Sequence, residues 1–480
     1  MSISSVLFVF FFLPLSLAGQ WIIGYFHNRA LSDIYTVFIS LVFYGWADVR
    51  MIGFILFVAG LLCLYSYVQK EEKNNKWLMV FVITTLLVFL SYCKYTNFAI
   101  NNLNRFLHMA VESKELIVPV GVSFITFEAI SYVVDIHNGE RKGSFLEILL
   151  FLSFFCKVTS GPIVSWKRFH TQIQSRSINL ADVTEGSRMF IVGLAEKVIV
   201  ADILGQTVYD ILLRFSEHTV DAFSAVLCGL CYMVQIYYDF SGYSNMAIGM
   251  SRMFGFVFDR NFNEPYRSLS ISEFWRRWHI SLGTWFREYI YIPLGGNRDH
   301  VYRNLFIVFL LTGLWHGHGA GWNFILWGAM NGLLVVMERK NRDKQWYLQI
   351  PSVFKHLFVL IFVYFSWILF SFDSLGEVRR FIGVILGRNS HQFVNFTWKY
   401  YFTRRVIVLL IFAFCNDLLI RESIKKRITT WMNDHEVLQY GLSVLLLIAA
   451  VIWMVNSTYN PFIYFNFFSL CHFSHKFSFD

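Results

Sequence analysis

Residues 312–322, with the sequence TGLWHGHGAGW, place two histidines and four glycines between apolar runs near 303–315 and 320–337. Glycine weakens a helix, so this many glycines within so short a stretch predict a break between two flanking helices. At membrane depth, irregular backbone and ionisable side chains are tolerated only where they are buried in protein or line a wet cavity. We therefore expect His316 to face an internal cavity and to be functional, with a purely structural histidine as the alternative.

Apolar runs recur along the whole chain. Of its 480 residues, 56% are hydrophobic and 15% are charged, whereas about a quarter of a soluble protein is charged. The further runs lie near residues 6–26, 31–47, 51–69, 77–93, 115–134, 145–158, 188–213, 222–247, 353–372, 405–420 and 436–455. A membrane-spanning helix needs about 20 apolar residues, so some runs are expected to be re-entrant or half-helices. We predict an all-α polytopic membrane protein of about ten to thirteen membrane segments, forming a single domain over residues 1–480.

The excess of basic residues indicates a lipid bilayer as partner and no nucleic acid. The net charge is +9, from 41 Lys and Arg against 32 Asp and Glu. Cytoplasmic loops of membrane proteins collect Lys and Arg, and no basic domain stands apart from the apolar runs. We expect such loops at residues 70–76, 339–344 and 425–427. The seven cysteines show no spacing typical of a disulfide scaffold.

A polar stretch, residues 259–303, contains the clearest amphipathic helix. From 270 to 289, apolar side chains recur at spacings of three and four. They are Ile271, Phe274, Trp275, Trp278, Leu282, Trp285 and Tyr289. Ser270 with Glu273 forms a capping-box start, and His279 lies at the shoulder of the apolar stripe. We predict an interfacial helix near 270–290 with His279 facing a cavity; a mere membrane-surface anchor is the alternative.

Other polar residues interrupt the apolar segments. Glu196 and Lys197 are adjacent and face different sides of a helix, so neighbouring segments must supply their partners. For these two, and for a polar group within residues 119–135, a buried hydrogen-bonded contact between helices is the favoured interpretation. For Asp239, a structural role and a functional role are equally favoured. The His-x-His spacing at 316–318 suggests metal binding, but no further ligand lies nearby in sequence, so we expect no metal.

Seven blocks of the sequence together resemble the membrane-bound O-acyltransferase family, in particular its bacterial alginate O-acetylation branch. The blocks are residues 41–46, 119–135, 160–163, 196–202, 239–244, 261–298 and 313–317. The block at 261–298 is the most specific, because it includes FWRRWHISL at 274–282. The resemblance covers residues 40–337, which leaves 338–480 as C-terminal membrane segments without motifs.

The resemblance implies a many-helix fold around a central tunnel and an O-acyltransferase activity, with no tightly bound cofactor. It further implies a thioester donor, either acetyl-CoA or an acyl carrier protein, and an exported polysaccharide as acceptor. Members of this branch work in the bacterial cytoplasmic (inner) membrane with a separate extracytoplasmic acyltransferase. D-alanyl transfer to teichoic acid is the nearest alternative chemistry in the same family.

The family motifs also imply roles for individual residues. The signature histidine corresponds to His316, and the second motif histidine corresponds to His279. His318 is the alternative to His316, because the spacing to the following Trp322 in the family would select it. Further catalytic or supporting residues are expected at Trp315, Asp239 and Asn245. Apart from the motifs, Arg276 and Arg277 are expected to bind phosphate, either of the donor or, equally well, of lipid headgroups at the membrane surface.

Two other classes of function stay open at this level. Broken segments with intramembrane Asp and His residues would suit a proton-coupled transporter or flippase. No inverted repeat is visible, however, and transport gives no reason for the block at 274–282. A non-catalytic scaffold is the third possibility and requires dispensable histidines. The sequence lacks the G-x-S-x-G and G-x-x-x-x-G-K-[ST] motifs, which argues against a serine hydrolase and an ATP-driven pump.

Overall fold

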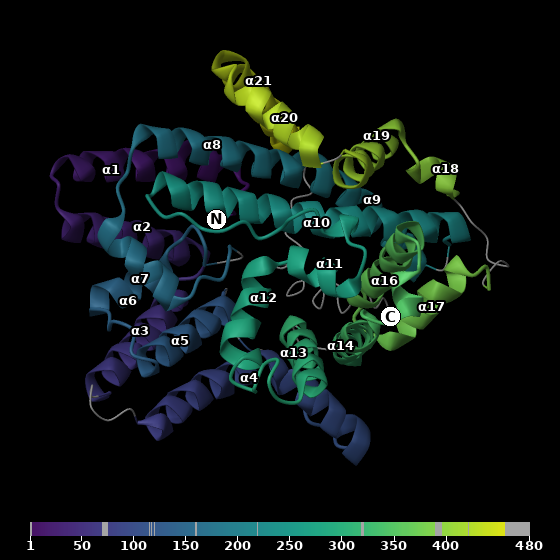
Figure 1. Ribbon diagram of the computed structural model, residues 1–480, viewed down its shortest axis with the longest axis horizontal. Coiled ribbons are helices and arrows are strands. Elements are labelled where there is room, and N and C mark those ends of the chain that lie inside the picture. The colour runs from purple at the N-terminus through teal and green to yellow at the C-terminus, as the bar shows by residue number, and fades with distance from the viewer. Residues whose placement is uncertain are drawn as a thin grey trace. The chain divides into compact units, whose positions relative to one another are not determined.

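The computed structural model of the protein describes most of the chain (Figure 1). The described residues are 2–69, 75–114, 116, 118–119, 121–158, 161–217, 219–317, 321–388, 396–420 and 422–456. Within these ranges the secondary structure is helical and no strand occurs, as predicted. The chain divides into two compact units, Met1–Gly193 with Tyr243–Arg260, and Leu194–Gly242 with Asn261–Asp480. Each unit is described separately below.

Seven helices in the described residues are long and apolar enough to cross a membrane. They are Phe8–Tyr25 (η1 and α1), α2 (Arg29–Ala47), α3 (Arg50–Val68), α4 (Lys76–Leu107), α10 (Ala222–Met253), α16 (Ser352–Ser371) and α21 (Glu436–Asn456). The predicted ten to thirteen segments included re-entrant and half-helices, and the remaining apolar runs form shorter or interrupted helices. They include α5 (Val122–His137), α6 (Phe145–Ser153), α8 (Leu180–Ala195), α9 (Asp202–Ser216), α13 (Val301–His316) and α19 (Arg404–Phe414).

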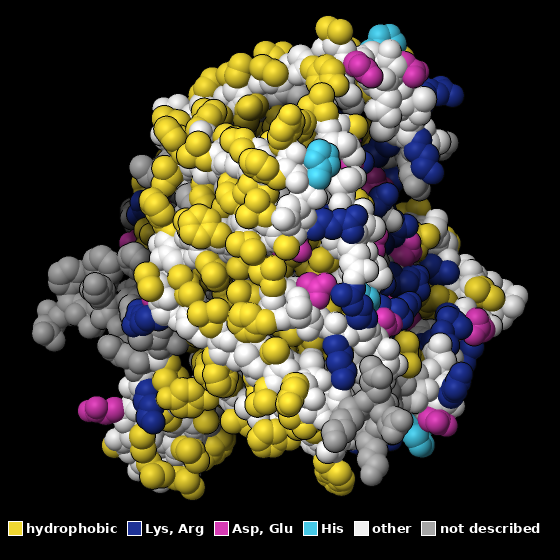
Figure 2. Space-filling model, turned by 90° about the vertical axis from the view of Figure 1, so that its left-hand side faces the viewer, with side chains coloured by type: hydrophobic (Ala, Val, Ile, Leu, Met, Phe, Trp, Pro, Cys, Tyr) yellow, Lys and Arg dark blue, Asp and Glu magenta, His cyan; other side chains and the backbone are white. Residues whose placement is uncertain are grey.

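Apolar side chains cover much of the molecular surface, as a lipid environment requires. Figure 2 shows a face on which hydrophobic side chains gather densely, with Lys and Arg along one edge. Leu15 and Phe38, on α1 and α2, are 68% and 60% exposed. In α21, only 11% of the most apolar stretch of the helix is buried. Soluble monomers rarely expose apolar surface on this scale, so the protein is an integral membrane protein.

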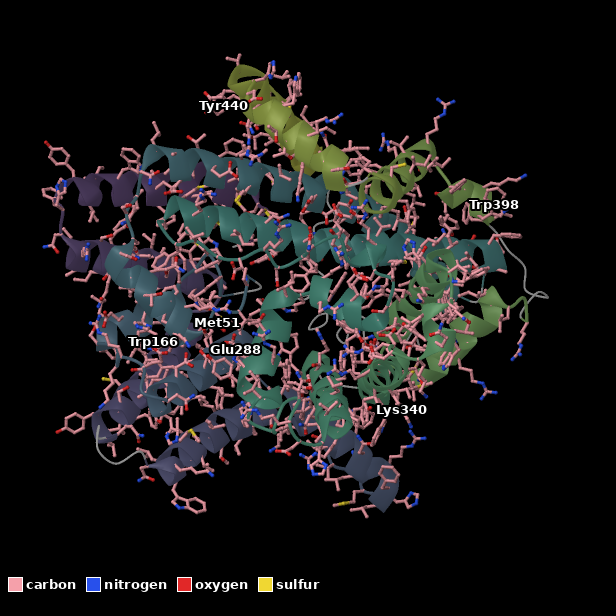
Figure 3. The ribbon with its side chains drawn as sticks, in the orientation of Figure 1. Met51, Trp166, Glu288, Lys340, Trp398 and Tyr440 are labelled. Carbon is pink, nitrogen blue, oxygen red and sulfur yellow. The ribbon has the colours of Figure 1, made fainter. Side chains whose placement is uncertain are left out.

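The first unit is stabilised by buried polar contacts between its elements. The Lys157 ammonium, in the loop after α6, contacts Glu128 Oε1 of α5 at 2.5 Å, and both side chains are buried. Asp135 Oδ2 accepts a hydrogen bond of 2.9 Å from the Lys167 backbone N–H at the start of α7 (Trp166–Ser175). Trp166, labelled in Figure 3, packs against the Phe151 ring at 5.3 Å. The polar group within residues 119–135 is therefore structural, as predicted.

In the second unit, Glu196 and Lys197 lie on a π-helical turn, η2 (Glu196–Ala201), and face different partners, as predicted. Lys197 Nζ forms ion pairs with Asp202 and with Asp239, the latter at 2.8 Å. The Ser241 hydroxyl donates to Glu196 Oε2 at 2.9 Å. These contacts connect η2 to α10 in a buried environment where an unpaired charge would be costly.

The helices α13 and α14 (Trp322–Asn341) form a closely packed hairpin around the glycine-rich break. A Cβ atom on Gly313 would lie 2.5 Å from the Phe324 carbonyl oxygen and 2.8 Å from the Cα of Gly328. Small residues at such positions allow two helix backbones to approach. The α13 helix ends at His316 and α14 begins at Trp322, which confirms the predicted break.

Replacing Gly313 by alanine is expected to destabilise the protein by about 1–3 kcal/mol, because the added Cβ meets immobile backbone atoms. Gly441→Ala in α21 is the matched control, since no atom lies within 4 Å of its Cβ position. That control is expected to leave the melting temperature unchanged or slightly raised. Thermal unfolding in detergent measures both variants, and equal melting temperatures would contradict the close packing of the hairpin.

Candidate active site

A cavity of about 760 Å³ lies within the second unit. Its wall comes from α11 (Ile271–Arg277), α12 (Ile280–Phe286), η4 (Arg287–Tyr291), α13 and α14. These elements follow one another in teal and green in Figure 1. Figure 3 labels Glu288 on η4 and Lys340 near the end of α14. Both His279 and His316 line this cavity, although 37 residues separate them in the sequence.

The predicted continuous helix over 270–290 is wrong in one respect, because it is broken at His279. Five of the seven side chains of its apolar stripe are buried, and Trp275 and Tyr289 are half-buried. However, α11 ends at Arg277, and His279 adopts a left-handed backbone conformation with φ of 46°. The neighbouring residues bond to a different segment of chain. The Ile280 N–H donates to the Asn261 carbonyl at 2.9 Å, and the Asn263 N–H donates to the Arg277 carbonyl at 2.9 Å. These bonds replace intrahelical ones and turn His279 toward the cavity wall.

The side chain of Asn261 determines which nitrogen of His279 carries the proton. Asn261 Oδ1 accepts hydrogen bonds from the Ser281 backbone N–H at 3.1 Å and the Ser281 hydroxyl at 3.0 Å. His279 Nδ1 lies 3.2 Å from the same oxygen. Because a carbonyl oxygen only accepts, Nδ1 must donate, and Nε2 is then the basic nitrogen. Nε2 is buried and bonds to no described residue.

Burial also keeps His279 neutral. The side chain is 2% exposed, and burial lowers its pKa from 6.5 to about 3. A histidine must be neutral to accept a proton. His279 is therefore in the basic form throughout the neutral pH range, with its tautomer set by Asn261.

His316 ends α13 and is held among aromatic rings. Its ring centroid lies 4.6 Å from that of Trp315, 5.4 Å from that of Trp327 and 5.4 Å from that of Phe370. Trp315 also contacts His279, with a centroid distance of 6.2 Å. The predicted supporting residue Trp315 therefore lies against both histidines. His318, the alternative to His316, lies outside the described residues.

More indole rings extend this apolar environment along the cavity. Trp278 packs on Trp367 at 4.8 Å, and Trp275 packs on Trp327 at 5.3 Å. The Trp275 Nε1–H donates to Asn331 Oδ1 at 3.0 Å, which orients that indole. Aromatic rings therefore pack around the two histidines on this side of the cavity, where a lower polarity strengthens electrostatic interactions.

Arginine side chains also line the cavity. They are Arg276, Arg287, Arg339 and Arg342. Arg276 was predicted to bind donor phosphates, and the structure places it on the cavity wall. Arg277, predicted with it, instead pairs with Glu273 at 2.9 Å and donates to the Asn263 carbonyl at 3.0 Å. Arg339 and Arg342 were assigned to a cytoplasmic loop by the sequence, and the end of α14 brings them to the cavity.

Glu338 is a structural residue of the site that sequence reasoning missed. Its carboxylate accepts from the backbone N–H groups of Ile271 at 2.6 Å and Ser272 at 2.8 Å. The Ser272 hydroxyl donates to it at 2.7 Å. A carboxylate at a helix N-terminus satisfies free N–H groups and complements the helix dipole. Glu338 thus attaches α14 to the start of α11.

The remaining predicted site residues lie elsewhere. Asp239 is ion-paired with Lys197 as described above, which favours the structural interpretation of this carboxylate. Asn245 is half-buried on α10, in the part of that helix that belongs to the first unit. Among the described residues, no group of three His, Cys, Asp or Glu is arranged to hold a metal ion.

Fold and site together define an integral membrane protein with two buried histidines on the wall of one internal cavity. The sequence profile of MBOAT, the membrane-bound O-acyltransferase family, matches residues 34–375. The chain belongs to this family. The matched region includes all the elements that line the cavity and extends through α16, beyond the predicted limit at residue 337.

Named relatives agree with the family. The chain is 31% identical to the probable alginate O-acetylase AlgI of Pseudomonas putida, over 97% of this chain and 100% of that protein. It is 29% identical to the peptidoglycan O-acetyltransferase of Helicobacter pylori, over 96% of each chain. It is 28% identical to the teichoic acid D-alanyltransferase of Streptococcus thermophilus, over 70% of this chain and 84% of that one. The protein is accordingly a membrane O-acyltransferase.

Proposed function

We propose that the protein moves an acetyl or similarly short acyl group from a cytoplasmic thioester donor toward hydroxyl groups of an exported polysaccharide. The observation that carries this proposal is the placement of His279 and His316 on one cavity wall lined also by arginines. A cavity of about 760 Å³ is large enough for the acyl-bearing end of a donor. The named alginate and peptidoglycan O-acetylating relatives support a polysaccharide acceptor.

In the proposed reaction a histidine activates the attacking hydroxyl. An alcohol is a weak nucleophile until a base removes its proton, and a positioned base contributes typically about 10²- to 10⁴-fold in rate. His316 takes the hydroxyl proton as the oxygen attacks the thioester carbonyl. The new C–O bond forms, the C–S bond breaks, and the proton passes to the departing thiolate. His279, neutral and oriented by Asn261, is the second histidine at the reacting group.

The arginines are proposed to hold the donor. Acetyl-CoA and the prosthetic group of an acyl carrier protein both carry phosphate, which arginine binds through two parallel hydrogen bonds. Arg276, Arg339 and Arg342 are the residues proposed for this role, because all three line the cavity. Arg277 is paired with Glu273 and does not line the cavity, so it is not proposed for this role.

The acceptor side is proposed to require a second protein. A separate extracytoplasmic acyltransferase would complete transfer onto the polysaccharide, with this protein in the bacterial inner membrane. The D-alanyl-transferring relative supports the second candidate, in which the acyl group is D-alanyl and the acceptor is teichoic acid. The two candidates differ in the acyl group that is transferred and in the polymer that receives it.

The test is the ester-linked acyl content of the exported polysaccharides, measured in wild-type, deletion and complemented cells. We expect the deletion to lose O-acetyl esters and complementation to restore them. Loss of D-alanyl esters instead would favour the second candidate. Unchanged esters of both kinds in the deletion would refute the proposed acceptor class.

A further inference from the structure

The helix α20 (Glu422–Asn433) exposes an apolar stripe with the basic residue Arg427 at its edge. Ile424, Ile428 and Trp431 are 48%, 52% and 49% exposed. They recur at spacings of four and three, so they lie on one face of the helix. Lys426 and Arg427 are both exposed. By the helical repeat, Arg427 lies about 60° from Ile424, at the edge of the stripe, whereas Lys426 lies about 200° away, on the opposite face. The sequence predicted a solvated loop here, and the basic run is instead part of an amphipathic helix.

The position of α20 between two apolar helices limits how it can lie. It follows α19 and η5 (Cys415–Leu419) and precedes α21, the most lipid-exposed of the candidate spans. The Arg405 guanidinium, at the start of α19, lies 5.2 Å from the centre of the Trp453 ring, near the end of α21. The two helices are therefore antiparallel, and α20 connects them at one membrane surface.

One edge of α20 contacts the rest of the second unit, which fixes the direction of the stripe. Lys425 Nζ contacts Glu264 Oε1 at 2.6 Å. Lys425 is 100° around the helix from Ile424, given the helical repeat, so the apolar stripe lies beside this contact and not beneath it. Despite burial, which raises it, the hydrogen bonds from Lys425 and Arg267 hold the pKa of Glu264 below its usual value. The contact thus stays charged at neutral pH.

We propose that α20 lies in the plane of the bilayer surface and binds anionic lipid headgroups. The apolar stripe of Ile424, Ile428 and Trp431 enters the boundary between headgroups and acyl chains, and Arg427 at its edge contacts the phosphates. Amphipathic helices with basic flanks bind anionic membranes in this manner. Tryptophan side chains such as that of Trp431 are enriched at membrane–water interfaces.

Lipid is the occupant that these observations favour over a protein. The stripe lies on the connection between two helices whose apolar side chains are exposed. Because such a connection leaves the membrane core, the stripe lies at the level of the headgroups. Its charge is complementary to anionic phosphates. The Lys425–Glu264 contact connects this helix to residues 261–267, the segment that bonds to His279.

The experiment measures hydrogen exchange of the full-length protein, one copy per nanodisc, in phosphatidylcholine with and without 30% phosphatidylglycerol. We expect the amides of residues 424–433 to exchange at least about threefold more slowly in the anionic bilayer. The difference should shrink at high salt, which screens headgroup contacts. Arg427→Gln should remove it. Lys426→Gln removes an equal charge from the opposite face of the same helix and should retain it.

Other outcomes would overturn the proposal. Equal exchange in the two bilayers, or full protection in the Arg427→Gln variant, would exclude anionic lipid as the ligand. Protection that appears only in nanodiscs with two copies would identify a second copy as the occupant. Exchange of α10 amides serves as the folding control, because that helix is 83% buried and should be unchanged in both variants.

Discussion

His316→Ala is expected to abolish acyl transfer while the protein stays in the membrane at normal levels. The loss should be about 10²- to 10⁴-fold, because the substitution removes the proposed base. The ring packs against Trp315, Trp327 and Phe370, so a fold control is needed. The measurement is ester-linked acyl content of exported polysaccharide, normalised to the amount of protein in the membrane.

His318→Ala is the control that decides between the two histidines of the motif. If His316 is the base, the His318→Ala variant should retain most of its activity. If only His318→Ala loses transfer, the signature histidine is displaced by two residues. Retained acyl transfer in both variants would show that neither histidine of this motif is catalytic.

Asn261→Ala is expected to lower the acyl-transfer rate at least about tenfold, which corresponds to ~1.4 kcal/mol of transition-state stabilisation. The substitution removes the acceptor that keeps the proton of His279 on Nδ1. It also removes the acceptor for the Ser281 N–H, which helps to hold the turn at His279. Asn341→Ala, whose side-chain bond lies within its own helix, is the matched control and should be active.

Asn261→Asp separates positioning from general damage to the fold. A carboxylate can accept the same hydrogen bonds, but its charge favours protonated His279 and raises a pKa that is otherwise about 3. Activity of this variant should therefore fall as the pH is lowered from 8 to 6 and recover as it is raised. The wild type should show no such acid limb from His279. Identical pH profiles would show that Asn261 has no influence on the histidine.

The sequence was most informative where one pattern combined several signals. Glycines, apolar flanks and histidines together predicted the break after His316, and α13 ends at that residue. The periodicity of 270–289 predicted which side chains are buried, and the capping residue Ser270 is the N-cap of α11. Local patterns of this kind reflect hydrogen bonding and burial within a few residues, so a single sequence reports them.

The sequence was least informative where distant residues meet. Asn261 lies 18 residues from His279, and Glu338 lies 67 residues from Ile271. Nothing local marks either residue, although Asn261 opens the longest block that carried the family resemblance. The break at His279 was missed for the same reason, because its backbone bonds are made to residues 261–263. Arg339 and Arg342 were assigned to a loop because their charge alone does not show which surface they line.

The carboxylate of Glu338 has a mechanical consequence. It couples the hairpin that carries His316 to the helix that precedes His279, through bonds to two backbone N–H groups and one hydroxyl. A displacement of α14 is therefore expected to carry α11 with it, so that the segments bearing the two histidines move together.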